Sequence, residues 1–315
     1  MRSPDGRITP NLFGIATGTA GLGAAWQVAH GQGLVPDWPA AALFALAAAV
    51  WLALVVARMR SRTLVGEWRD PVLGPFVSLV PIGGMVLGLA LSTYAPTAGG
   101  AVFAVFALAT LVLAARIAAC WAAHPPSLRT LHSGYLLPTV AGGLLAAAGF
   151  ARTGQLDSAR IAFGSGLACW AVLGSIVTVR LLRGPRLPAA LIPTLAIEIT
   201  PPVLAGNALL AINGGRIDAL TCVFGVWAAV ATVVQVVLLR MYLRSPFAPG
   251  MWAFAFAYAA TATYALHWID LTRPPGAALL AALVLTAVTG LIAGIAVRTV
   301  VGIRRGTFLP VAPAA

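Results

Sequence analysis

Glu198 is the one carboxylate that lies deep inside an apolar stretch of this chain, about eleven residues into the segment 187–213. An ionised carboxylate at mid-membrane depth costs at least about 2.5 kcal/mol, so an acid there usually faces a cavity and performs a task. Thr194 and Pro201 fall on the same helical face, so Glu198 projects on the side of a bend. The residue is a candidate proton or substrate site. The alternative is a neutral acid that hydrogen-bonds to a neighbouring helix.

Helix-breaking residues gather in alternate apolar segments. Pro81, Pro138 and Pro201 lie inside the third, fifth and seventh segments, and Gly14 and Gly18 lie inside the first. A proline removes one helical hydrogen bond and bends the helix, and freed backbone groups are tolerated in a membrane where they line a cavity. The three prolines are therefore predicted to kink helices around a pore. The two glycines either permit close helix contact or expose backbone carbonyls to that pore.

Large rings among small residues distinguish the ninth segment, which reads GMWAFAFAYAATATYALHW over 250–268. Rings such as Phe254 and Phe256, set between alanines, can obstruct a narrow path and move aside at low cost. The alternative is that these aromatic residues pack against other helices or face lipid. Composition by itself leaves both interpretations open.

The composition is that of a membrane protein. Hydrophobic residues make up 60% of the chain, charged residues 9%, and the mean hydropathy is +0.93. A spanning helix needs roughly 20 predominantly apolar residues. Ten such segments fill nearly the whole chain, at 11–30, 38–58, 73–94, 99–123, 135–152, 157–182, 187–213, 217–242, 250–269 and 276–302.

The segments alternate between irregular and regular types, and this alternation predicts an architecture. Odd-numbered segments carry Gly, Pro and Thr, whereas most even-numbered ones are smooth runs of Ala, Leu and Val. A helix that only faces lipid has no use for breakers. We therefore predict an all-α polytopic membrane protein of five helical hairpins, with odd helices around a pore and even helices outside. The expected parts are a cytoplasmic segment 1–10, a ten-helix domain 11–303 and a cytoplasmic tail 304–315.

The positive charges set the expected orientation. All twenty basic residues are arginines, and the net charge is +12. Most lie at the termini or after even segments. By the positive-inside rule, this distribution places both termini in the cytoplasm. The expected location is the inner membrane of the cell. Arginines that flank membrane segments also explain the net charge without nucleic-acid binding. Those in connections after odd segments are Arg152, Arg160, Arg216 and Arg273.

The chain shows no catalytic or cofactor signature. It lacks a Ser/His/Asp set at plausible depth, paired carboxylates and a phosphate-binding glycine loop. Cys120, Cys169 and Cys222 lie singly in separate segments, without the spacing of metal ligands or of a redox pair. We therefore expect no catalytic residues, no metal and no cofactor.

Several short motifs follow one another along nearly the whole chain. They are Phe13-Gly14-Ile15, Asp70-Pro71, the run Phe76 to Pro81, Arg116, Trp121, His132, Leu137-Pro138, Pro201, Ile212-Asn213-Gly214, and Trp252 to Phe256. In this order they resemble the tellurite-resistance/dicarboxylate transporter family, which includes the bacterial homologue of the plant guard-cell slow anion channel.

The resemblance implies a fold, an assembly and an activity. Family members have ten helices in five hairpins and assemble as homotrimers with one pore in each protomer. A phenylalanine of the ninth helix blocks the family's pore midway, and Phe256 is similar in position. The implied substrates are small anions: chloride or nitrate, sulfite, tellurite, or a C4-dicarboxylate such as malate.

Two departures from the family pattern affect the functional prediction. Ala16 stands where the family has a proline in its first helix, and Glu198 stands where channel-like members have an apolar residue. A carboxylate facing an anion path repels the substrate unless it is protonated. A proton-coupled dicarboxylate carrier that uses Glu198 is therefore an alternative to a channel. An intramembrane enzyme is a second alternative, which would need a polar cluster that the sequence does not show.

Overall fold

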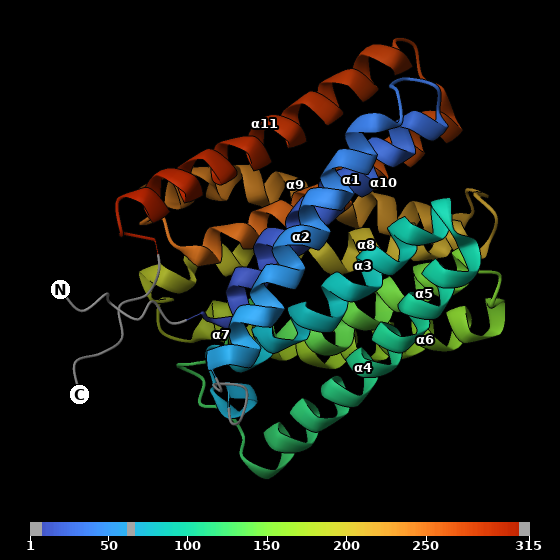
Figure 1. Cartoon of the computed structure of the whole chain (residues 1–315). Coiled ribbons are helices and arrows are strands. Elements are labelled where there is room, and N and C mark those ends of the chain that lie inside the picture. Colours follow the sequence, from blue (N-terminus) through green and yellow to red (C-terminus); the bar gives the residue numbers. More distant parts are fainter. Residues whose placement is uncertain (1–7, 62–66, 309–315) are drawn as a thin grey trace.

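The computed structural model describes residues 8–61 and 67–308, and every regular element in these two ranges is helical (Figure 1). Eight helical segments are long and apolar enough to cross a membrane. They are Trp38–Arg60, Gly74–Tyr94, Pro96–Ala123, Ser133–Arg152, Leu156–Arg183, Ala189–Ile212, Ala219–Arg244 and Ala277–Arg304. The all-helical membrane fold expected from composition is thus confirmed, while the boundaries at 10 and 303 stay predictions.

Two further helices are long but less apolar. They are α1 (Phe13–Gly31) and α10 (Trp252–Thr272), and glycine, threonine and polar aromatic residues lower their hydropathy. They correspond to the first and ninth segments of the ten expected. Both are nevertheless among the most buried parts of the molecule, with Phe13, Ala20, Ala255 and Ala259 fully buried.

The other α-helices follow in chain order. They are α2 (Trp38–Ser61), α3 (Leu79–Tyr94), α4 (Pro96–Ala123), α5 (Gly142–Arg152), α6 (Leu156–Cys169), α7 (Ser175–Arg183), α8 (Thr200–Ile212), α9 (Ala219–Arg244) and α11 (Ala277–Arg304). Short 3₁₀ turns at Pro10–Leu12, Glu67–Arg69 and Pro249–Met251 precede some of them.

Three of the spanning segments begin in non-α geometry and become α-helical beside a proline. The 3₁₀ helix η3 (Gly74–Ser78) leads into α3, where Pro81 lies in the first turn. Pro138 lies in the π-helical segment η5 (Leu137–Ala141), and Pro201 begins α8 after the 3₁₀ helix η7 (Ala189–Ile199). A proline in the first helical turn removes no helical hydrogen bond. The irregular geometry therefore precedes Pro81 and Pro201, whereas the sequence predicted that these prolines themselves bend the helices.

Burial separates the spanning segments into two groups. The most apolar windows of Gly74–Tyr94, Ser133–Arg152 and Ala189–Ile212 are 67%, 67% and 78% buried inside the protein. The windows of the other five are only 17% to 28% buried. The regular helices thus carry most of the exposed Leu and Val side chains, as expected for surfaces that face lipid.

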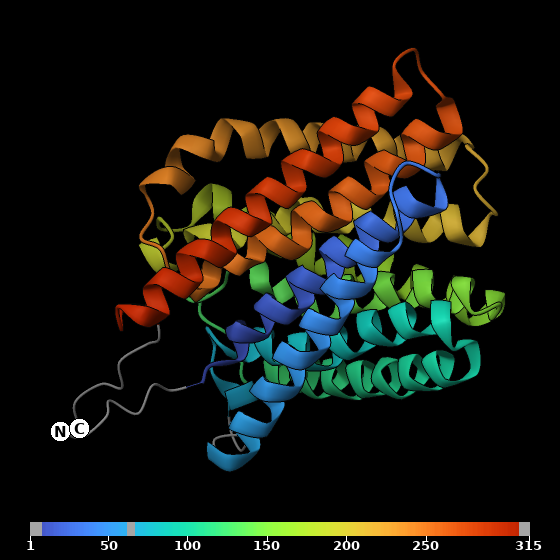
Figure 2. The ribbon, with the colours of Figure 1, turned by 45° about the horizontal axis from the view of Figure 1, so that its top comes forward.

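The irregular helices contact one another and each also contacts a regular one. Contacts join α1 to α3, α3 to α5, α5 to α8, α8 to α10 and α10 to α1. Figure 2 shows α2 running beside α1 and α11 beside α10, and the contacts α3–α4, α5–α6 and α8–α9 complete the pairs. Figure 2 shows the start of α1 and the end of α11 at the same end of the bundle.

Candidate functional site

A cavity of about 480 Å³ lies among the five irregular helices, and we call it the wide cavity. Each helix contributes residues spaced three or four apart, which is the spacing of one helical face. On α10 these residues are Phe256, Ala260, Thr263, His267 and Asp270. The wide cavity therefore follows the helix axes from Phe256 toward the ends of α5, α8 and α10. Phe44 of α2 also reaches its wall.

A second cavity lies at the other side of Phe256, and we call it the narrow cavity. Its volume is only about 20 Å³. A site needs about 10–15 Å³ to hold one water molecule, so the narrow cavity holds about one. Its walls come mainly from the non-α segments and the helix starts. They include Gly14, Phe76, Leu79, Leu137, Ile197, Thr200 and Trp252.

Phe256 alone among the described residues lines both cavities. Phe256 therefore borders both spaces. Phe254, two residues earlier on α10, lines neither of them and packs against Tyr242, with ring centroids 4.7 Å apart, and against Tyr258. The two phenylalanines are equally buried, with 8% of each residue exposed. Burial does not distinguish them, whereas their position relative to the cavities does.

Glycines of α1 allow α10 to pack closely against α1, at the level where Phe256 borders the two cavities. A Cβ on Gly14 would lie 3.1 Å from the Trp252 Cβ, and a Cβ on Gly21 would lie 3.1 Å from the Ala259 Cβ. A Cβ on Gly18 would overlap the Ala255 Cβ, so α1 and α10 could not keep this separation. Gly14 also lines the narrow cavity, whereas Gly18 lines neither and serves helix contact.

The prolines and Glu198 lie around the narrow cavity without lining it. Pro81, Pro138 and Pro201 are buried at the starts of α3, η5 and α8, beside residues that form the wall. Glu198 lies on η7 between Ile197 and Thr200, but its carboxyl group lies beside Ser133 instead of the cavity. Within the described residues, Glu198 Oε1 and Ser133 Oγ are buried without a hydrogen-bond partner.

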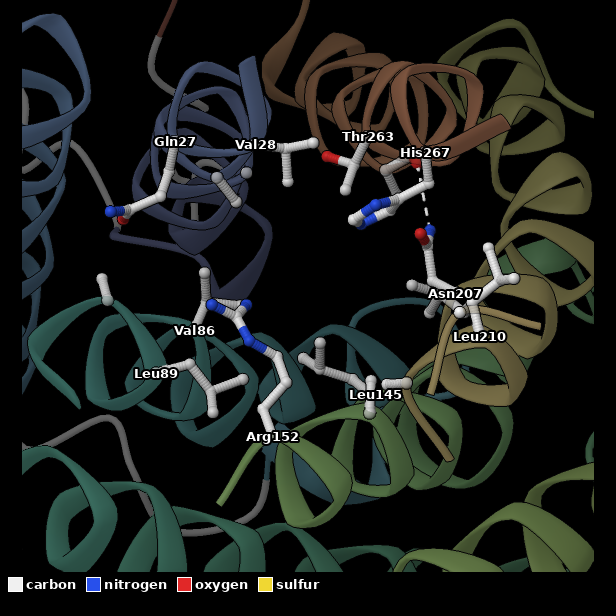
Figure 3. Close-up of a pocket in the computed structure, with 18 of the residues that line it drawn as sticks. Gln27, Val28, Val86, Leu89, Leu145, Arg152, Asn207, Leu210, Thr263 and His267 are labelled. Atoms are coloured by element: carbon white, nitrogen blue, oxygen red, sulfur yellow. Dashed lines mark hydrogen bonds between the residues drawn. The ribbon is translucent and has the colours of Figure 1, made fainter. Parts of the chain in front are cut away.

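The wide cavity holds polar groups that sequence reasoning did not assign to a site. Figure 3 shows Arg152, Thr263 and His267 pointing into it from α5 and α10, with valine and leucine side chains around the same space. Asn207 donates from Nδ2 to the Ala260 carbonyl oxygen at 3.3 Å, and its Oδ1 has no partner in the described chain. From the sequence, Arg152 is assigned only to a connection between segments, because nothing in linear spacing relates it to His267, which is 115 positions later.

A hydrogen-bonded cluster around His132 packs against Phe76, a residue of the narrow cavity's wall. His132 Nδ1 accepts from the Gly134 amide, and Nε2 donates to the Val72 carbonyl oxygen, each at 3.0 Å. Both bonds fit one neutral tautomer. Burial lowers the pKa of His132 to about 4. The ring stacks on Phe76, which lines the narrow cavity, with centroids 5.5 Å apart.

Across residues 8–61 and 67–308, no three or more His, Cys, Asp or Glu side chains cluster in a way that could hold a metal ion. The three cysteines are unpaired. The chemistry of the described cavities is therefore that of apolar walls with a few hydrogen-bond donors, which suits passage or binding of a small solute.

Comparison with known proteins places this geometry in a family. The tellurite resistance protein TehA homolog of Haemophilus influenzae is 25% identical over 266 residues, which cover 82% of this chain and 80% of that protein. The family described as voltage-dependent anion channel matches residues 7–300, which is nearly the whole chain. The resemblance inferred from the short motifs is thereby confirmed, and the chain belongs to the voltage-dependent anion channel family.

Proposed function

We propose that this protein carries small anions across the membrane through a central pore that Phe256 gates. The observation that carries the proposal is the position of the Phe256 ring between the wide and narrow cavities. Both cavities are lined chiefly by the irregular helices, and they lie end to end along α10. Membership of an anion channel family supports the same assignment.

The pore in this proposal is enclosed by α1, α3, α5, α8 and α10, with the regular helices outside. The closed series of contacts from α1 through α3, α5 and α8 to α10 and back supports it. The difference in burial between irregular and regular segments supports it as well. Pro81, Pro138 and Pro201 then shape the narrow end, because the non-α segments beside them supply its wall.

The described conformation corresponds to a closed gate. The narrow cavity has room for about one water molecule, whereas an anion that crosses must keep or replace its hydration shell. A rotation of the Phe256 side chain would join the two cavities. Rotating a side chain away from its preferred rotamer by about 30° costs of order 0.5–1.5 kcal/mol, so opening by this route is energetically accessible.

The candidate substrates are chloride, nitrate, sulfite, tellurite and C4-dicarboxylates such as malate. Tellurite is included because the Haemophilus influenzae relative is named a tellurite resistance protein homolog. Flux of each anion into liposomes containing the purified protein tests the proposal. We expect protein-dependent flux of at least one of these anions that increases linearly with concentration. Liposomes that pass none of them would contradict anion transport.

A proton-coupled dicarboxylate carrier is the second candidate, and Glu198 is the observation that favours it. Its buried carboxyl group, which lies beside Ser133, is a place where a proton could reside. Against a direct substrate contact, Glu198 lines neither cavity. The liposome assay separates the two functions, because a carrier gives saturable flux that responds to a pH gradient.

Orientation and assembly complete the proposal. Both termini lie in the cytoplasm, since arginines concentrate at that end, and three copies assemble as in the family that the motifs resemble. A C-terminal reporter that is active only in the periplasm should stay silent, and a bright signal would overturn this orientation. Native mass spectrometry of the purified protein should give the mass of a trimer.

A further inference from the structure

The wide cavity contains a guanidinium group without a partner. Arg152 is the last residue of α5, and Figure 3 shows its side chain extending into the cavity. The two ion pairs of the described chain are Arg58–Glu67 and Arg160–Asp157. Arg152 makes no hydrogen bond or ion pair to any described residue. Arg152 is exposed to solvent, so its guanidinium is accessible to a dissolved anion that enters the cavity.

Other hydrogen-bonding groups face the same space at different depths. At a rise of 1.5 Å per residue, Thr263 lies about 10 Å and His267 about 16 Å above Phe256 along α10. Figure 3 shows His267 reaching toward the cavity from the wall opposite Arg152. Asp270 lies about 21 Å above Phe256 by the same rise, at the exposed rim. Arg152, the last residue of α5, is exposed as well, so the cation and the carboxylate both lie toward the open end of the cavity.

We infer that Arg152 and His267 form an oxyanion-binding site in the wide cavity, above the gate. The inference rests on the proposed function, for which it names the recognition site and the class of anion. The ligand is an anion that presents two coplanar oxygens, as nitrate and a carboxylate do. Chloride lacks such an edge and is held less well.

The chemistry of the two side chains determines this preference. A guanidinium is planar and offers parallel N–H donors that match two coplanar oxygens, which gives a bidentate, charge-assisted pair. A ring nitrogen of His267 can donate to the far side of the same anion. Val28, Leu145 and Leu210 form an apolar wall around these donors. The surrounding volume of about 480 Å³ is within the range of small-molecule sites.

Direct binding tests the inference independently of transport. The melting temperature of the detergent-solubilised protein is measured while chloride is replaced stepwise by nitrate or by acetate at constant ionic strength. The matched control is Arg160→Gln, which removes the same charge near the same end of the bundle but outside the cavity, where Arg160 pairs with Asp157. General salt effects on stability act equally on both variants.

We expect nitrate and acetate to raise the melting temperature of wild type and Arg160→Gln above the value in chloride. Arg152→Gln should lose this rise, with binding at least about tenfold weaker, as expected for a charged hydrogen-bonding group. Arg152→Lys keeps the charge but lacks the two parallel N–H donors of the guanidinium, so it should bind both oxyanions more weakly than wild type. Asp270→Asn removes a like charge from the rim and should strengthen binding.

A full rise retained by Arg152→Gln, or no rise in wild type, would overturn the inference. Liposome flux of wild type is measured in parallel. Arginine-dependent binding without flux would support the site and refute transport. Flux without arginine-dependent binding would support transport and refute the binding site.

Discussion

The two cavities on either side of Phe256 differ in size, in wall chemistry and in the backbone that forms them. The wide cavity is lined by continuous α-helical faces and contains Arg152, Thr263 and His267. The narrow cavity is lined by 3₁₀ and π segments and by helix starts, with large apolar side chains such as Phe76 and Ile197. In the proposed channel, the wide end would receive the anion and the narrow end would restrict its passage.

Removing the ring that separates the cavities should give the largest effect. Phe256→Ala joins the wide and narrow spaces. We expect anion conductance in planar bilayers to rise about two- to tenfold, because moving the ring aside costs of order 0.5–1.5 kcal/mol and the variant has no ring to move. Folding should be largely retained, because the ring borders a cavity on each side.

Phe254→Ala is the control, since Phe254 has the same burial and lies two residues away. It packs against Tyr242, so its removal should cost about 3–5 kcal/mol of stability and leave conductance per folded molecule unchanged. The assignment of Phe256 as the gate would be contradicted if the two variants had equal conductance. It would also be contradicted if well-folded Phe256→Ala had a conductance at or below that of wild type.

Acid should destabilise the narrow end through His132. Its pKa is about 4 when folded and about 6.5 when unfolded. Below pH 6.5 the unfolded chain binds a proton that the folded chain does not, so stability falls from pH 6.5 to about pH 4 and then levels off. The loss is about 3 kcal/mol. His132→Gln can still donate to the Val72 carbonyl and should lose this dependence on pH in thermal unfolding; an unchanged profile would exclude His132 as its source.

The close contact of α1 with α10 should be sensitive to a single methyl group. Gly18→Ala places a Cβ against Ala255, and overpacking of this kind costs about 1–3 kcal/mol. Gly290 on the regular helix α11 has open space around it, so Gly290→Ala should be neutral or stabilise by up to about 1 kcal/mol. Thermal unfolding of both variants checks the contrast, and equal effects would contradict a special role for the glycines of α1.

The smallest effect on channel activity is expected at Glu198, because it lines neither cavity. If anions pass by simple conduction, Glu198→Gln should leave the anion conductance and its pH profile unchanged. If the protein is a proton-coupled carrier, the same variant should flatten the pH dependence between about pH 5 and 8. Flux measured over this range in liposomes decides between the two functions.

The sequence predicted the helical membrane fold because apolar length is a local property. It also placed Gly and Pro in the odd segments, where they act on the backbone. The structure nevertheless shows α1 and α10 as continuous α-helices, and a π-helical stretch at Trp170–Gly174 interrupts an even-numbered segment. Phe256 followed from motif resemblance, and composition left it equal to Phe254. The sequence did not place the 3₁₀ and π segments, because these depend on how the first turns pack against neighbouring helices.

The tertiary structure alone decided which side chains share a cavity. Phe254 and Phe256 lie on one helix among the same small residues, and the rotation of α10 against the glycines of α1 puts only the second between the cavities. Arg152 of α5 and His267 of α10 line the same cavity from opposite walls. Glu198 lies beside Ser133. The physical reason is that composition determines whether a helix enters the membrane, whereas its rotation is set by close packing with partners far away in the chain.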